Sequence, residues 1–234
     1  MIVVDPQVTL IAHTHFDADA AAAAMEGFRT DADGGQALAE AAGRACYQSF
    51  AKPNPATATN AGYLRHILEV GHESVLEHAS ASFYVTGVSR SLLAELSRHR
   101  HISLSVRSQR YCDEGDPGIV LPPAANDTTA SSWLMGIMVV VEAKYHELVE
   151  HFTDVGLPRK QAREAARAVL PNMVETRFVL TANMCAYRDV LRRRWHVAAD
   201  AEIQRFAGML LEQLRVLAPN VFQDFPAAPF GSDA

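Results

Sequence analysis

Residues 95–111 read Glu-Leu-Ser-Arg-His-Arg-His-Ile-Ser-Leu-Ser-Val-Arg-Ser-Gln-Arg-Tyr, and this stretch is the most informative part of the chain. It combines four arginines and two histidines with several hydroxyl side chains. Guanidinium groups carry planar sets of N–H donors that match phosphate oxygens, and imidazoles and hydroxyls add short-range hydrogen bonds. A solvated basic strand is the structural alternative. We expect the segment to bind an anionic ligand, because folding alone does not require so many polar donors.

The residues around this stretch predict a helix followed by an extended segment. Ser89 can cap a helix that runs to about His99, with Leu92, Leu93 and Leu96 packing inward. The chain then becomes extended. Strict alternation would place one set of side chains on a common face: Ile102, Leu104, Val106, Ser108 and Arg110.

The remainder of the chain predicts many helices and few strands. Strands are expected at about 8–12, 80–88 and 174–181, and helices at about 35–47, 60–70, 131–152, 158–170, 183–194 and 200–217, while 17–33 fits a short helix or a loop. Segregated helices with few strands favour an α+β fold over a doubly wound sheet. We expect residues 1–217 to form a single domain and the proline-rich residues 218–234 to form a loosely ordered tail.

The composition is that of an ordinary globular protein, with 49% hydrophobic and 21% charged residues. The net charge of −6 argues against general nucleic-acid binding. The first residues lack the features of a signal peptide, and no apolar run is long enough to span a bilayer. The cysteines (Cys46, Cys112 and Cys185) form no CxxC pair. These features predict a cytoplasmic protein without membrane contact or structural zinc. No other metal site is expected, since the arginines around His99 and His101 would repel a divalent cation.

Several stretches together resemble one enzyme family. Arg98-His99-Arg100, followed by seven residues and then Ser108, resembles the Arg-His-Arg-x7-Ser signature of flavin-dependent thymidylate synthases. Further similar stretches occur in the family's order: Asp31-Ala32-Asp33-Gly34-Gly35, Gly43-Arg44-Ala45-Cys46-Tyr47, Gly71-His72-Glu73-Ser74-Val75-Leu76-Glu77-His78 and Ala165-Ala166-Arg167-Ala168-Val169-Leu170-Pro171. The resemblance covers roughly residues 30 to 217.

This resemblance implies a fold and a reaction. The family has a single-domain α+β fold, in which long helices pack with a small, mostly antiparallel sheet, and it forms homotetramers with sites between subunits. Its members methylate C5 of dUMP to give dTMP. Reduced FAD transfers a one-carbon unit from methylenetetrahydrofolate and supplies the hydride that completes the methyl group, and NADPH re-reduces the flavin. The chain is therefore expected to be an FAD-dependent methyltransferase.

The resemblance also assigns site residues, position by position. The uridylate nucleotide is expected to contact Glu95, Arg98, Ser108, Gln109, Arg110, Arg167 and Arg194, with Arg110 and Arg167 on its phosphate. FAD is expected to contact Ser74, Arg98, His99, Arg100 and Asn183. Arg194 is expected to be the catalytic residue.

The expected chemistry does not use a cysteine nucleophile. The classical thymidylate synthases attack C6 of uracil with a cysteine in a Pro-Cys motif, and none of the three cysteines here has that context. Carbon 5 of a neutral uracil is a poor nucleophile. A fixed guanidinium near N3 and the adjacent carbonyl stabilises the enolate-like anion that activates this carbon. The resemblance assigns this part to Arg194.

Three positions depart from the family pattern, all on the flavin side. Val106 stands where Glu or Gln usually contacts both flavin and nucleotide, Cys185 where an arginine is common, and Asp189 where His or Asn helps to bind the flavin. The changes predict weaker flavin binding, by roughly several tenths to a few kcal/mol. They leave open a relative that methylates UMP in a nucleoside-antibiotic pathway, and a catalytically silent nucleotide-binding paralog. An RNA-binding module conflicts with the acidic net charge.

Overall fold

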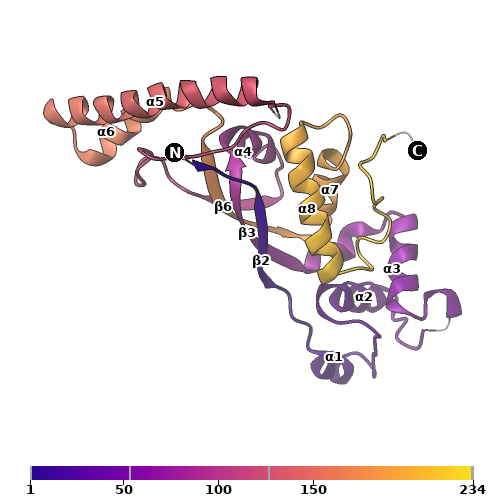
Figure 1. Ribbon diagram of the computed structural model, residues 1–234. Coiled ribbons are helices and arrows are strands. Elements are labelled where there is room, and N and C mark those ends of the chain that lie inside the picture. The colour runs from indigo at the N-terminus through magenta and orange to yellow at the C-terminus, as the bar shows by residue number, and fades with distance from the viewer. Residues whose placement is uncertain (1, 53, 126, 233–234) are drawn as a thin grey trace.

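An antiparallel sheet in the strand order β2–β3–β6–β4 forms the centre of the molecule (Figure 1). The structure is a computed structural model that describes residues 2–52, 54–125 and 127–232. The strands of this sheet are β2 (Gln7–His13), β3 (Ser80–Ser89), β6 (Glu175–Asn183) and β4 (Ile102–Val106). Separately, β1 (Ile2–Val3) pairs in parallel with β5 (Gly118–Ile119). The small, mostly antiparallel sheet expected from the sequence is confirmed.

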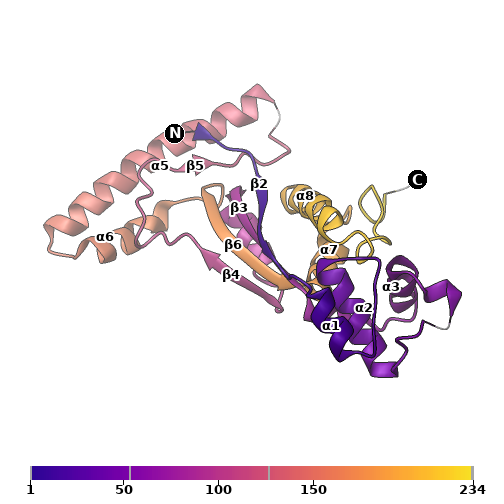
Figure 2. The same cartoon turned by 90° about the horizontal axis from the view of Figure 1, so that it is seen from below.

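Helices cover one face of the sheet and extend beyond both of its ends (Figure 2). They are α1 (Ala18–Ala24), α2 (Gly34–Tyr47), α3 (Asn60–Glu69), α4 (Arg90–Leu96), α5 (Thr128–Asp154), α6 (Arg159–Ala166), α7 (Met184–Arg194) and α8 (Ala201–Leu217), with short 3-10 helices at Pro55–Thr57, Glu73–His78 and Arg167–Val169. Figure 2 shows α5 and α6 at one end of the sheet and α1, α2 and α3 at the other. In the part of the chain that the structure describes, no helix has both the length and the apolar character needed to cross a bilayer.

The main hydrophobic core lies between the sheet and the helices that cover it. On β3, Phe83 and Val85 are buried while Tyr84 between them is exposed, which confirms the alternation expected for this strand. Helix α8 buries Phe206 and Leu210 in the same core. An amphipathic helix packed on one face of a sheet is a two-layer solution typical of α+β folds.

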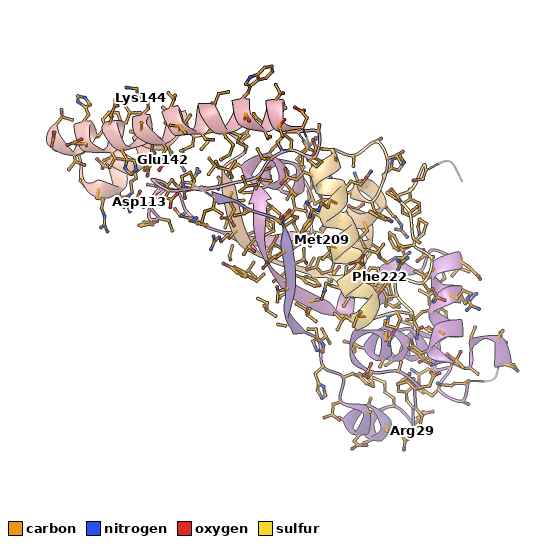
Figure 3. All side chains as sticks on the ribbon, viewed as in Figure 1. Arg29, Asp113, Glu142, Lys144, Met209 and Phe222 are labelled. Carbon is orange, nitrogen blue, oxygen red and sulfur yellow. The ribbon has the colours of Figure 1, made fainter. Side chains whose placement is uncertain are left out.

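The segment after α8 differs from the expected loose tail. Val221, Phe222 and Phe225 are buried in the main core, and Figure 3 shows Phe222 beside the end of α8. The anchor is the fully buried Arg188 of α7, which donates hydrogen bonds to the carbonyl of Val221 and to both carboxylate oxygens of Asp224, at 2.7 and 2.6 Å. The proline content predicted a loosely ordered segment, but composition does not show that the aromatic side chains of this segment are buried in the core. Residues 233–234 of the expected tail lie outside the described residues.

The chain around the Arg-His-Arg motif turns earlier than expected. Ser89 caps α4 by accepting the N–H of Leu92 at 3.0 Å, as the sequence predicts, but the helix ends at Leu96 rather than His99. Strand β4 ends at Val106, so the expected alternation through Ser108 and Arg110 is wrong. The chain turns there because the Ser108 carbonyl accepts the N–H of Cys112 at 2.9 Å.

The buried segment after α8 gives the first prediction. Phe222→Ala is expected to lower the free energy of unfolding by about 3–5 kcal/mol, the usual cost of removing a buried phenyl ring. In a chain of this size each kcal/mol lowers the melting temperature by about 2–4 °C. The matched control is Val216→Ala, at a side chain that is 87% exposed, with an expected change within about 0.5 kcal/mol. Equal and small decreases in melting temperature for the two variants would contradict the packed segment and would support a loosely ordered tail.

Candidate active site

The pairing of β4 with β6 brings the Arg-His-Arg motif to helix α7. The two strands are antiparallel, and Ile102 at the start of β4 lies opposite Ala182 near the end of β6. Residues 98–101 directly precede β4, and α7 directly follows β6. The motif and the helix therefore meet at the same edge of the sheet, although about 90 residues separate them in sequence.

This junction forms a cationic pocket of about 640 Å³. It is lined by Arg98, His99, Arg100 and His101 from the turn before β4, and by Asp189, Arg193 and Arg194 from α7. Four guanidinium groups around one hollow favour an anionic ligand, because a compact cluster of like charge is costly without counter-charge. Among the residues that line the pocket, Asp189 is the one carboxylate.

Arg194 is held in place from three directions at the edge of this pocket. Its two terminal nitrogens donate to the carboxylate and to the backbone carbonyl of Glu95, both at 2.9 Å. Its Nε donates to Nε2 of His99 at 3.0 Å. The Arg194 side chain is 15% exposed, so its orientation is fixed while part of it faces solvent. A guanidinium has five N–H bonds, and these three contacts leave one on each terminal nitrogen for a ligand.

His99 is enclosed by charged neighbours on both ring nitrogens. Its side chain is 5% exposed, and Nδ1 lies 3.4 Å from a carboxylate oxygen of Asp189. Burial lowers the pKa of His99, the charge of Arg194 lowers it further, and Asp189 opposes both, with a pKa below the usual value as the result. The ring is therefore neutral at neutral pH.

The other expected nucleotide residues lie in a second group, beyond the opposite end of β4. Arg110 forms an ion pair with Glu164 of α6, with 2.6 Å between Nε and the carboxylate oxygen. Arg167 follows α6 directly and is half-buried. The charge of Arg167 also contributes to lowering the pKa of Arg90, after the larger effect of burial. Ser108 and Gln109 lie in the turn that carries Arg110. The ion pair with Glu164 holds Arg110 of this second group against α6.

Two further expected flavin residues lie outside the pocket around Arg194, and one of them stands at the opposite end of α7. Asn183 caps this helix, where its side-chain oxygen accepts the N–H of Ala186 at 2.8 Å. Ser74 is exposed in a smaller hollow that it shares with Cys46 and Glu73. Glu73 fixes this hollow against α7, because its carboxylate accepts hydrogen bonds from Arg192. The expected flavin contacts therefore follow α7 from one end to the other.

None of the cysteines is arranged as an activated nucleophile. All three are free thiols. Burial raises the pKa of Cys185, and the nearby charges of Glu73 and Glu77 raise it further, so this thiol stays protonated at neutral pH. The pocket around Arg194 contains no cysteine. This arrangement agrees with ring activation by a guanidinium.

The sequence analysis missed Arg193 as a pocket residue. Arg193 lines the same pocket as Arg194, and its Nε donates to Asp189 at 2.9 Å. The signal was present in the sequence, because residues four apart on a helix lie on the same face. The carboxylate of Asp189 is therefore paired with the guanidinium of Arg193.

The fold and site define the class of protein. It is an α+β protein with an arginine-rich pocket suited to an anionic ligand, and its sequence has no Rossmann or P-loop motif. Residues 30–220 match the model of the family described as thymidylate synthase complementing protein. The chain belongs to this family.

Similar proteins agree with this assignment. The flavin-dependent thymidylate synthase of Mycobacteroides abscessus is 52% identical over 238 residues, which cover 97% of this chain and 92% of that protein. The flavin-dependent thymidylate synthase of Mycobacterium tuberculosis is 55% identical over 204 residues, covering 84% and 82%. A solved structure of the UMP/dUMP methylase PolB from Streptomyces cacaoi, bound with 5-Br dUMP, has a TM-score of 0.71 at 20% identity and covers 99% of both chains. That likeness confirms the expected fold.

The residues around α7 fit FAD by the chemistry of their donors. The guanidiniums of the Arg-His-Arg pocket supply positive charge and N–H donors that suit the oxygens of a pyrophosphate. The amide of Asn183 at the start of the helix and the exposed hydroxyl of Ser74 in the smaller hollow provide neutral hydrogen-bonding groups. The carboxylate of Asp189 is the exception, and its contact with Arg193 offsets its charge.

The contact between Glu73 and α7 gives a prediction on pH. Burial raises the pKa of Glu73, but the hydrogen bond from Arg192 and the charge of Arg188 lower it more, so it lies below the ordinary value of 4.5. Glu73→Gln is expected to cost about 1.5–3 kcal/mol at neutral pH, the range for charge-assisted hydrogen bonds. The stabilisation is complete above the ordinary pKa and is lost as the pH falls through the lower folded value.

Urea unfolding across this pH range measures the effect. The difference in the free energy of unfolding between wild type and Glu73→Gln should be constant near neutral pH. It should shrink below about pH 4.5. Glu147→Gln is the matched control, because Glu147 forms an exposed pair with Lys144 and should cost less than about 1 kcal/mol. A Glu73→Gln difference that is independent of pH would contradict the assignment.

Proposed function

We propose that this chain catalyses the flavin-dependent reductive methylation of C5 of dUMP to dTMP, with methylenetetrahydrofolate as carbon donor and NADPH as reductant. The family membership and the named activity of relatives above 50% identity support this function. The observation that carries it is the fixed guanidinium of Arg194, which is held by Glu95 and His99 and keeps two N–H donors for a ligand. Location in the cytoplasm stays a prediction from the sequence.

The remaining donors of Arg194 suit the N3 edge of a uracil ring. A carbonyl oxygen of the ring accepts one N–H bond directly. The second N–H lies on the other terminal nitrogen of Arg194. N3 of the ring can accept this hydrogen bond only after N3 has lost its own proton. Arg194 therefore favours the anionic form of the ring, in which C5 is more nucleophilic. Glu95 contributes by holding this guanidinium, and its own carboxylate offsets the charge while no substrate is bound.

FAD, when bound, supplies one-carbon transfer and hydride delivery at C5. We propose that Arg98, His99 and Arg100 hold it at the pocket, that Asn183 holds it at the start of α7, and that Ser74 holds it from the smaller hollow beside this helix. Arg110 and Arg167, with Ser108 and Gln109, are our proposed contacts to the phosphate side of the nucleotide. The guanidinium of Arg110 lies near one carboxylate, and that of Arg167 lies near another cation. A doubly charged phosphate would offset the positive charge of this group and would accept its N–H donors.

We further propose that the complete site forms between copies of this chain. Arg194 and Arg98 belong to the pocket on α7, whereas Arg110 and Arg167 lie beside α6. Among the described residues, the hydrogen bonds and ion pairs of these two groups do not join them. A second copy that supplies the other group would complete a nucleotide site. Residues 1–217, with the packed segment that follows, would then act as one catalytic domain within a homotetramer.

Helix α5 offers an apolar surface for such an assembly. Trp133, Ile137 and Val140 lie on one face at helical spacing and are 72%, 54% and 60% exposed. They line a shallow, almost wholly apolar hollow with Gly136 and Val141. Exposed apolar patches of this kind mark interaction surfaces in soluble proteins. Helix α8, another long helix, instead buries its apolar face in the core.

Arg194→Ala tests the proposed chemistry. The variant is expected to lower tritium release from 5-labelled dUMP by about 10²- to 10³-fold, the usual loss when a group that stabilises a developing oxyanion is removed. FAD, NADPH and methylenetetrahydrofolate are supplied at saturation. The charge-matched control is Arg65→Ala, at an exposed residue of α3, which should retain wild-type turnover. Unchanged turnover in Arg194→Ala, or a trapped covalent adduct between a cysteine and the pyrimidine, would disprove the mechanism.

The same assay separates the alternatives. Faster release from labelled UMP than from dUMP would identify the UMP-methylating relative. No release from either nucleotide, together with a rise in melting temperature on adding dUMP, would identify a silent nucleotide-binding paralog, because ligands stabilise by mass action whether or not they react.

Val140→Asp tests the proposed assembly. A carboxylate in the centre of an apolar interface is expected to dissociate the tetramer, because a buried charge without a partner is strongly unfavourable. Light scattering coupled to size-exclusion chromatography measures the mass. The control is Val216→Asp, the same substitution at an exposed valine of α8, which should leave the mass unchanged. A wild-type monomer, or a Val140→Asp tetramer, would contradict the proposal.

A further inference from the structure

The contacts of His99 require one particular tautomer of its ring. The guanidinium of Arg194 stays protonated in proteins, so its Nε can only donate a hydrogen bond. Nε2 of His99, 3.0 Å away, must therefore be the acceptor and carry no proton. A neutral imidazole then has its single proton on Nδ1. Nδ1 faces the carboxylate of Asp189, which can only accept.

We propose that Asp189 is a positioning residue: it holds His99 in the Nδ1–H tautomer, so that Nε2 accepts from Arg194 and fixes the guanidinium for catalysis. This inference rests on the proposed role of Arg194. It gives a function to the position that the sequence analysis treated as a loss on the flavin side. The carboxylate acts through His99 and is not expected to touch the substrate.

The surroundings of Asp189 support this role. Its other carboxylate oxygen accepts the Nε–H of Arg193 at 2.9 Å, which anchors the side chain on the surface of α7. The first oxygen lies 3.4 Å from Nδ1, a long hydrogen bond that a small rotation of this half-exposed side chain shortens. His99 is nearly buried, so water has little access to replace the carboxylate. Asp189 is thus the acceptor available to Nδ1 among the residues lining this pocket.

Without the carboxylate of Asp189, the His99 ring would no longer be held in the Nδ1–H tautomer. Without an acceptor at Nδ1, the ring is free to carry its proton on Nε2, where it would point at the N–H of Arg194. Two donors facing each other cannot hydrogen-bond, and the guanidinium would lose one of its three supports. Asparagine keeps an acceptor oxygen at the same place, so Asp189→Asn should preserve the arrangement while removing the charge.

The direct test is NMR of the histidine ring in protein labelled with ¹³C and ¹⁵N histidine, with His99→Gln used to assign the signal. Wild type and Asp189→Asn should show the Nδ1–H tautomer, and Asp189→Ala should show a mixture or the Nε2–H form. Glu147→Ala is the matched control, because it removes an exposed carboxylate far from His99 in sequence and should leave the tautomer unchanged. An Nε2–H ring in wild type, or an unaltered Nδ1–H ring in Asp189→Ala, would overturn the proposal.

Kinetics provide the second measurement. Asp189→Ala should lower kcat by about 10- to 100-fold, the range for misplacement of a catalytic group, while KM for dUMP changes less than threefold. Asp189→Asn should recover most of the lost kcat. Equal losses in both variants would mean that the charge, not the acceptor, matters, and would contradict the positioning role. The tautomer measurement does not need turnover, so an inactive wild type would refute the proposed function and leave this inference open to its own test.

Discussion

The guanidinium of Arg194 and the Arg-His-Arg turn hold each other, and the site depends on this contact. Glu95 and His99 belong to the end of α4 and the turn after it, whereas Arg194 closes α7. The antiparallel pairing of β4 with β6 brings these segments together. A change in strand register by one residue would move every side chain of β4 to the other face of the sheet. The geometry of the proposed catalytic group is therefore a consequence of strand pairing in the core.

The acidic net charge and the arginine-rich site are compatible because several of the arginines already have carboxylate partners. Arg194 contacts Glu95, Arg193 contacts Asp189, and Arg110 contacts Glu164. Such pairs hold the guanidiniums in fixed orientations before any ligand arrives, which lowers the cost of ordering them on binding. An anionic ligand then competes with, or adds to, a carboxylate at each position. This arrangement favours ligands with strong charge, such as the phosphates of a nucleotide or of FAD.

The sequence predicts the local structure well where one signal dominates. The alternation of Phe83, Tyr84 and Val85 predicts β3, and Ser89 predicts the start of α4, since both signals come from residues adjacent in sequence. The family resemblance assigns a role to Arg194, and the structure places this residue at the Arg-His-Arg pocket. The prediction failed for Phe222, because a short aromatic segment is buried only by the distant Arg188 and the core around α8. The contact between His99 and Asp189 also joins residues about 90 apart in sequence, and a linear pattern does not contain it.

The central claim is that Arg194 stabilises the anionic form of the uracil ring. The most direct measurement is the pKa of N3 in [3-¹⁵N]dUMP bound to the FAD-loaded protein, followed by ¹⁵N NMR as the pH is raised. The account predicts that bound dUMP loses its N3 proton at a lower pH than free dUMP. It also predicts that Arg194→Ala restores the free value. An N3 pKa that binding leaves unchanged, or that binding raises, would contradict the account.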